Sequence, residues 1–160
     1  MQCTQDNRFQ TIHESLFARG CNPSPARAAQ PPAAALPHLR RAIATYGGDF
    51  LAGSTAGDWA VTRRAELRLA YERALGAAGR LLVADGRVRE AIEVYRRAIA
   101  HEPLDEAAHR ALMECWAAAG QPARAMRHYE ELRELLRTEV GGAPAAQTTA
   151  LYARLRDAAR

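Results

Sequence analysis

Apolar residues recur every three or four positions along most of the chain, which is the period of an α-helix with one buried face. This pattern predicts helices over residues 6–19, 36–46, 58–85 and 144–158. Asp58 is well placed to cap the longest of them, because its side chain can accept a hydrogen bond from an unsatisfied backbone N–H of the first turn. The chain is therefore expected to be helical over most of its length.

Prolines and glycines interrupt this pattern in two places. Residues 21–35 are rich in alanine and proline and show no periodicity, so we expect a flexible, partly extended loop there. Gly47 and Gly48 end a helix and begin a second loop, in which Phe50 and Leu51 are expected to tuck under neighbouring helices. Both loops connect helices of one domain, because 160 residues suffice for one core but not comfortably for two.

The strongest internal signal is a spacing of 34 residues, which separates Gly86 from Gly120 and pairs several alanine and aromatic positions. This is the period of the tetratricopeptide repeat, in which glycine turns the chain between two helices that pack closely at small residues. The repeat units are predicted at residues 72–105 and 106–139. Their structural core is predicted to consist of Leu82, Ala91, Tyr95, Leu112, Trp116, Ala125 and Tyr129.

Each hairpin of such a repeat has an apolar face that it cannot bury alone, so successive hairpins must stack. The predicted fold is therefore all-α, a tetratricopeptide-like stack of antiparallel helix hairpins with about six or seven helices. The helix at 144–158 would cap the stack. Trp59, at the start of a helix, is expected to pack in the core, as Trp116 is.

Composition narrows the possible chemistry. All 22 basic residues are arginines, which excludes a lysine Schiff base and a P-loop lysine in this chain. The three cysteines and five histidines show no metal-ligand spacing, and no nucleophile has a base nearby in sequence. No metal, cofactor or catalytic residue is therefore predicted. No apolar run reaches the length of a membrane span and no secretory signal is recognisable, so a cytoplasmic protein is the expectation.

The arginines could also serve in binding. In a tetratricopeptide stack the first helix of each pair lines a groove, and the repeat register assigns four exposed groove positions, Arg73, Arg80, Arg110 and Glu114. Such a groove could hold an acidic peptide through bidentate pairs between arginine and carboxylate groups. Charged residues would equally be needed to keep alanine-rich helices soluble, and both interpretations stay open.

Several stretches of the sequence share features with one family. They are Asp6-x-x-Phe9, residues 39–53, Asp58-Trp59-Ala60, residues 86–91, residues 102–106 and the tail from Pro144 to Tyr152. Their combination resembles the bacterial transcriptional activator domain, the helical module of regulators of the Streptomyces antibiotic regulatory protein type, over residues 6–158. Such regulators usually carry a winged-helix DNA-binding domain directly before this module, whereas here only a tail, residues 1–5, precedes it. The chain is thus expected to be either a fragment of a longer regulator or a stand-alone module.

The resemblance implies a non-catalytic protein–protein interaction and oligomerisation domain that supports transcription activation. Its partners would be a second copy of the chain, a DNA-binding domain or RNA polymerase, with DNA contacted only indirectly. Two alternatives stay open. One is a general tetratricopeptide adaptor that binds an acidic peptide or a partner helix. The other is a weak DNA-binding regulator that uses basic pairs such as Arg40-Arg41 and Arg96-Arg97.

Overall fold

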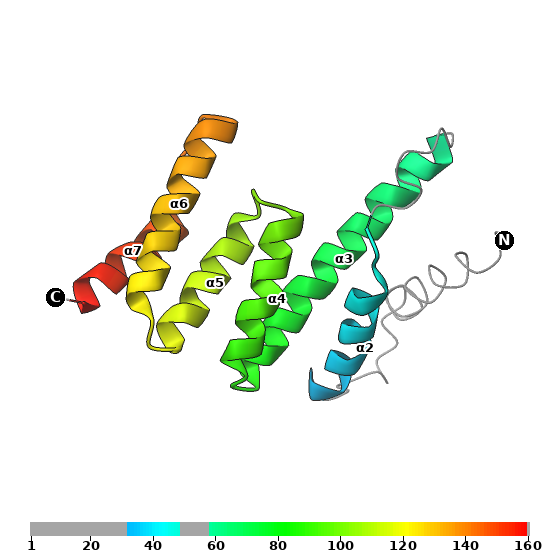
Figure 1. The fold of residues 1–160 in the computed structure, drawn as a ribbon, viewed down its shortest axis with the longest axis horizontal. Helices are drawn as coiled ribbons and strands as arrows, with labels where there is room; N and C mark the ends of the chain where they lie inside the picture. Colours follow the sequence, from blue (N-terminus) through cyan, green and yellow to red (C-terminus); the bar gives the residue numbers. More distant parts are fainter. Residues whose placement is uncertain (1–31, 49–57, 160) are drawn as a thin grey trace, which may run out of the picture. The chain divides into compact units, whose positions relative to one another are not determined.

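A computed structural model describes residues 32–48 and 58–159 of the chain. The helices within this described part are α2 (Pro32–Thr45), α3 (Asp58–Ala84), α4 (Val88–His101), α5 (Glu106–Ala118), α6 (Pro122–Val140) and α7 (Ala146–Ala158) (Figure 1). No strand occurs among these residues, so the all-α prediction is confirmed. The helix predicted at 6–19 lies outside the described residues, and so do Phe50 and Leu51.

The chain divides into two compact units, residues 1–81 and residues 82–160. In the first unit, Leu36 and Ile43 of α2 are buried. Tyr46, just after α2, stacks on Tyr71 of α3 with ring centroids 4.1 Å apart. The alanine- and proline-rich loop was predicted to reach residue 35, but α2 already begins at Pro32. Proline is favourable in the first turn of a helix and alanine has the highest helix propensity, so this segment joins the helix.

The buried face of α3 corrects the prediction for Trp59. Ala60 is fully buried, and the buried stripe continues through Leu67 and Ala74 at the seven-residue spacing of one helix face. Trp59 precedes this stripe by one residue, which turns its side chain roughly 100° away from the stripe. It is accordingly 63% exposed, and the expectation that it packs in the core is wrong.

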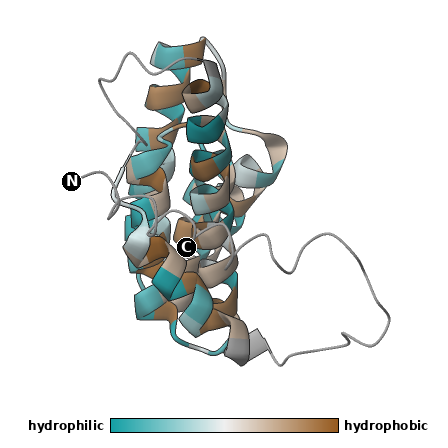
Figure 2. Cartoon of the chain, turned by 90° about the vertical axis from the view of Figure 1, so that its right-hand side faces the viewer, coloured by the Kyte–Doolittle hydropathy of each residue, from teal (hydrophilic) through white to brown (hydrophobic). Residues whose placement is uncertain are grey.

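The second unit consists of the last turn of α3 and the helices α4 to α7. Helices α4, α5 and α6 run antiparallel as neighbours, and α7 packs against α6 and α5 (Figure 1). Hydrophobic and hydrophilic residues are interspersed along the helices seen in Figure 2, as expected for amphipathic helices that pack together. The repeat positions expected in the core are all buried: Leu82, Ala91, Tyr95, Leu112, Trp116, Ala125 and Tyr129.

The backbone repeats itself at the two hairpin turns. In the first turn Gly86 N–H donates to the Val83 carbonyl at 3.0 Å and Arg87 N–H to the Leu82 carbonyl at 2.8 Å. The second turn makes the same two bonds, at the same distances, 34 residues later in the chain. The glycines adopt the same left-handed conformation, with φ of 73° at Gly86 and 74° at Gly120. Both turns are therefore Schellman motifs, which satisfy the last carbonyls of the preceding helix.

Helix α7 is held by a carboxylate from a distant part of the chain. Ala145, which precedes α7, has no side chain that could cap the helix. Instead the Glu106 carboxylate of α5 accepts hydrogen bonds from Ala145 N–H at 2.8 Å and from the Thr148 hydroxyl at 2.5 Å. Thr148 is fully buried, so this bond replaces the water that its hydroxyl loses. A negative charge at this position also stabilises the positive end of the helix dipole.

We predict that Gly120→Ala lowers the free energy of unfolding by about 1–2 kcal/mol, because the left-handed conformation crowds a Cβ against the following carbonyl. No other atom lies within 4 Å of the added methyl group, so the loss would come from the backbone alone. Urea unfolding followed by circular dichroism measures it. Gly142→Ala is the matched control: its backbone is not left-handed and its Cβ would make only an ordinary contact with Val140, at 3.5 Å. Equal losses in the two variants would contradict the argument.

We predict that Glu106→Ala destabilises the second unit by about 1–3 kcal/mol, since it leaves a buried hydroxyl and a backbone donor without their acceptor. Hydrogen exchange of the α7 amides should accelerate more than that of the α4 amides. Glu114→Ala removes an exposed glutamate from the same helix and should leave both quantities nearly unchanged. If the two variants behave alike, Glu106 does not hold α7.

Candidate functional site

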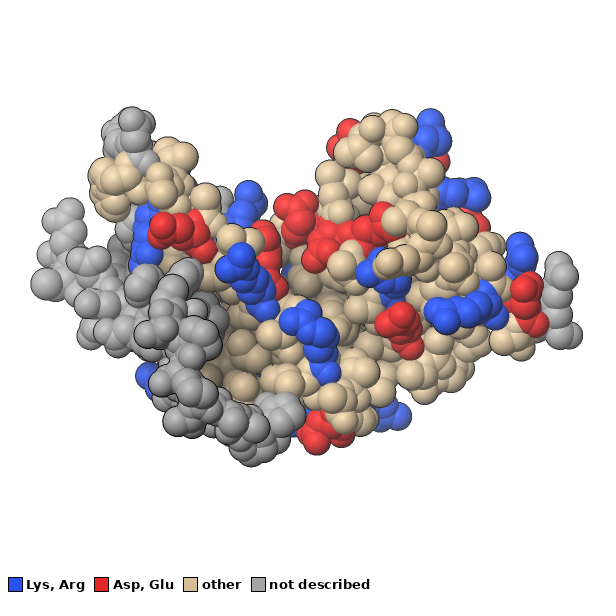
Figure 3. Space-filling model, turned by 180° about the vertical axis from the view of Figure 1, so that it is seen from behind, with Lys and Arg blue, Asp and Glu red and all other residues tan. Residues whose placement is uncertain are grey.

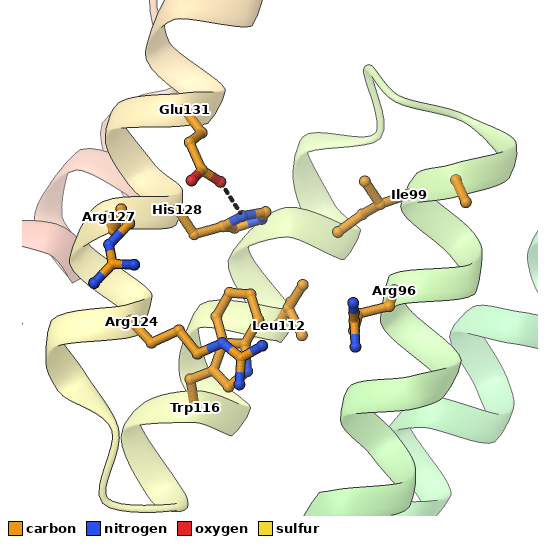
Figure 4. Close-up of a pocket in the computed structure, with 9 residues that line it drawn as sticks. Arg96, Ile99, Leu112, Trp116, Arg124, Arg127, His128 and Glu131 are labelled. Carbon is orange, nitrogen blue, oxygen red and sulfur yellow. Dashed lines mark hydrogen bonds and ion pairs between the residues drawn. The ribbon is translucent and has the colours of Figure 1, made fainter.

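A cleft of about 440 Å³ lies between α4, α5 and α6 in the second unit, and we call it the Trp116 cleft (Figure 4). Helix α5 supplies its apolar floor, and the outer helices supply walls that carry charged side chains. The lining residues are Arg96, Ile99 and Ala100 of α4, Leu112 and Trp116 of α5, and Arg124, Arg127, His128 and Glu131 of α6. Its volume falls in the range of roughly 300–1,000 Å³ that is usual for ligand sites.

Helical periodicity explains why these side chains converge. Arg124, Arg127, His128 and Glu131 follow one another at intervals of three, one and three residues, so they share one face of α6. Arg96 and Ile99 likewise share a face of α4, three residues apart. Because α4 and α6 flank α5 on either side, these two faces become opposite walls above the α5 floor.

Trp116 organises the centre of the cleft. The Arg124 guanidinium lies over its indole ring, 4.9 Å from the ring centroid, in a cation–π contact. The His128 ring meets the indole edge-on, with centroids 5.0 Å apart. Trp116 is only 5% exposed, and its Nε1–H is buried without a hydrogen-bond partner in the described part of the chain. Two side chains of α6 are thus held against one aromatic ring.

His128 of the α6 wall and His109 of α5 form a series of hydrogen bonds that begins at the Pro103 carbonyl oxygen. His109 Nε2 lies 3.0 Å from the Pro103 carbonyl oxygen, which can only accept, so this nitrogen must carry a proton. In the neutral ring His109 Nδ1 is then an acceptor, and His128 Nε2–H donates to it at 2.8 Å. The remaining nitrogen, His128 Nδ1, lies 3.4 Å from the Glu131 carboxylate. That last contact becomes a hydrogen bond only when His128 gains a second proton (Figure 4).

Burial opposes that protonation. Desolvation lowers the pKa of His128 below its ordinary value, and the neighbouring His109 lowers it further, although Glu131 raises it. Desolvation also lowers the pKa of His109, against the hydrogen bond to Pro103 and the nearby carboxylates, which raise it. Protonating His109 as well would leave two N–H donors facing each other. Both rings are therefore neutral near neutral pH, and the free nitrogen that can take up the first proton is His128 Nδ1, which faces Glu131.

The residues predicted to line a groove do not take part in this cleft. Arg110 and Glu114 precede the floor residues Leu112 and Trp116 by two positions each, which turns them roughly 160° away around α5. Arg110 is half-buried and donates to the Thr148 hydroxyl of α7 at 3.4 Å, and Glu114 is exposed. Arg73 and Arg80 are exposed residues of α3 and belong to the first unit. The structure thus brings together a different set of arginines.

Sequence reasoning missed Arg124, Arg127 and His128 as partners in one site. Their three- and four-residue spacing along a single helix was a usable signal. However, these residues alternate with glutamates, which also fits a solvated helix face. The partner wall on α4 could not be identified without knowing that α4 and α6 flank the same helix.

Other kinds of site are not found among the described residues. No group of three or more histidine, cysteine or acidic side chains within residues 32–48 and 58–159 could hold a metal ion. Cys115 is buried, and desolvation raises the pKa of its thiol, with a smaller contribution from Glu114. None of the described helices is long and apolar enough to cross a membrane. Arginines and acidic residues are interspersed over the face seen in Figure 3.

The histidine pair predicts a pH dependence of stability. Since the folded state holds both pKa values below the ordinary 6.5, the unfolded chain binds more protons below that pH. The stability that the neutral pair contributes is therefore present above about pH 6.5 and is lost as the pH falls toward the lowered pKa values. His128→Gln removes one of the two titrating groups, so its unfolding midpoint should fall less than that of the wild type between about pH 7.5 and about pH 5.

Urea unfolding at the two pH values measures this difference. His38→Gln, at an exposed position of α2, is the control and should keep the wild-type pH dependence. The proposed titration is refuted if His128→Gln keeps it too.

Comparison with known proteins identifies the family. No curated protein matches the chain. The family model described as "Bacterial transcriptional activator domain" matches residues 16–156, which include α2 to α6 and most of α7. The matched segment therefore contains both hairpin turns and the whole Trp116 cleft. The chain belongs to the bacterial transcriptional activator domain family, which places it among regulators of transcription.

Proposed function

We propose that this chain is a non-catalytic protein–protein interaction domain that supports transcription activation, and that it acts through surfaces of its helix stack. Candidate partners are a second copy of the chain, a DNA-binding domain and RNA polymerase. DNA would be contacted only indirectly, and the setting of such a role is the cytoplasm. The family supports the regulatory part of this proposal, and the geometry of the stack supports the part that concerns binding.

The observation that carries the proposal is the Trp116 cleft. It combines an apolar floor with arginines on both walls, and arginine is among the residues that most often dominate the energy of protein interfaces. The floor is fixed by packing, since Leu112 is 1% and Trp116 5% exposed. A surface that is rigid before binding loses little conformational entropy when a partner docks.

The repeat register also suggests contact positions on each of the two units. Arg73 and Arg80 are exposed on α3, and Glu114 is exposed on α5, so these side chains are accessible to a partner. Arg110 contributes less to such contacts, because its guanidinium already donates to Thr148. We keep these residues as proposed alternative contact positions, with Arg73 and Arg80 considered on the first unit and Glu114 and Arg110 on the second.

The test is activation by tethering. The full chain is fused to an unrelated bacterial DNA-binding domain whose operator lies upstream of a weak promoter that drives a reporter gene. We expect the fusion to raise reporter expression above that of the DNA-binding domain alone, because contacts made by the chain would recruit or stabilise the transcription machinery. Leu132→Asp places a carboxylate at a fully buried position of α6 and should abolish the effect by unfolding the stack.

Light scattering on a size-exclusion column completes the test, because self-association would appear as a mass above that of one chain. A folded, abundant fusion that leaves the reporter unchanged, together with a strictly monomeric chain, would contradict the proposed function.

A further inference from the structure

We propose that the Trp116 cleft binds an acidic segment of a protein partner, whose carboxylates pair with Arg96, Arg124 and Arg127 while one apolar side chain rests on the α5 floor. This inference rests on the proposed function and specifies the chemistry of the partner. It concerns a different surface from the groove predicted on the first helices of the repeats.

The charges of the cleft favour an anionic occupant. Three arginines and one glutamate line it, and the glutamate, Glu131, faces His128 within the same wall. Arg127 forms no ion pair with any residue in the described part of the chain. Arg96 lies 3.6 Å from Glu93, but both side chains are more than half exposed, so this pair is weak and can be exchanged for another. Arg124 donates one long hydrogen bond, of 3.4 Å, to the side-chain oxygen of Gln121. The three guanidinium groups can therefore take carboxylates without losing a strong ionic partner.

The position of the arginines matches a segment that passes across the cleft. Arg96 extends from α4 toward α5, and Arg124 extends from α6 over the indole, so the two flank the floor from opposite sides (Figure 4). The cation–π contact holds the Arg124 guanidinium in place above Trp116. A planar guanidinium that is already oriented can form two parallel bonds with a carboxylate at little entropic cost.

The floor limits what the segment can bury. Leu112 and Trp116 expose only a small part of their surface, whereas Ile99 on the α4 wall is half-buried. A cleft of about 440 Å³ between these residues holds one large apolar side chain and the groups next to it. The fitting motif is therefore one aromatic or aliphatic residue with aspartate or glutamate on both sides of it.

Nucleic acid fits this cleft less well. A phosphate backbone needs cations in a row along its path, whereas here Glu131 stands in one wall and Glu93 is next to Arg96. These carboxylates would repel a continuous row of phosphates. A peptide can place its acidic groups individually opposite the arginines.

The first step of the test is selection from a phage library of random dodecapeptides on the full chain. The selected peptides should be enriched in acidic residues around one apolar residue. A fluorescein-labelled peptide of the consensus sequence is then titrated with the wild type and the variants Arg96→Glu and Arg127→Glu, and binding is followed by fluorescence anisotropy. Each charge reversal should weaken binding at least about tenfold, because it replaces an attraction by a repulsion at close range. Added salt should weaken binding of the wild type.

Arg97→Glu is the matched control. It makes the same change of charge one position away on α4, at an exposed residue that does not line the cleft, and should alter binding less than about twofold, as screened surface charges do. Circular dichroism verifies that all variants keep the helical fold. Selected peptides without acidic enrichment, no selected peptides, or equal weakening by Arg97→Glu would each overturn the proposal. So would a duplex oligonucleotide that binds more tightly than the peptide and loses binding in the same variants.

The two proposals fail separately. The peptide titration decides whether the cleft takes an acidic segment, and the tethered reporter decides whether the chain supports activation. The wild-type fusion could activate the reporter while the selected peptides show no acidic preference. That result would contradict the inference about the cleft and leave the proposed function intact.

Discussion

Each helix hairpin of this chain is apolar on a face that it cannot cover by itself, and the architecture of the second unit depends on that constraint. Ala91 and Ala125 are fully buried, which fits close packing of helices at small side chains. Helix α5 lies between α4 and α6, so both of its neighbours shield it from water. The last hairpin, α5 and α6, has no following hairpin in this unit, and α7 packs against both of its helices. Glu106 joins this end to the start of α5.

The Trp116 cleft follows from the same stacking. Helices α4 and α6 lie on either side of α5. Their exposed side chains therefore form walls above the side chains of α5. The walls carry polar groups because they meet water, and the floor is apolar because it is part of the core. The indole N–H of Trp116 is buried and has no acceptor among the described residues.

How much could be predicted from the sequence depends on the range of the interaction. Some features are local and recur at a fixed spacing, and the repeat period allowed them to be predicted. These are the glycine turns, the proline and glycine breaks and the buried alanines. The prediction for Trp59 was wrong because adjacent residues of a helix point in different directions. Trp59 is exposed, whereas Ala60, the next residue, is buried. The cleft and the capping of α7 by Glu106 join residues from different helices. Such contacts depend on which helices are neighbours, and periodicity within a single helix carries no information about that.

The identity of the two hairpin turns bears on how a chain of this kind can change its length. Each turn is closed by backbone hydrogen bonds to the last turn of the helix that precedes it, so its geometry depends only on that helix end. A segment cut at equivalent points of the two turns would begin and end in the same backbone conformation. Duplicating it would create no new type of junction, and the added hairpin would present the same apolar face to its neighbours. Whole hairpins are thus the natural unit of insertion and deletion in this architecture, whereas single residues would disturb the register.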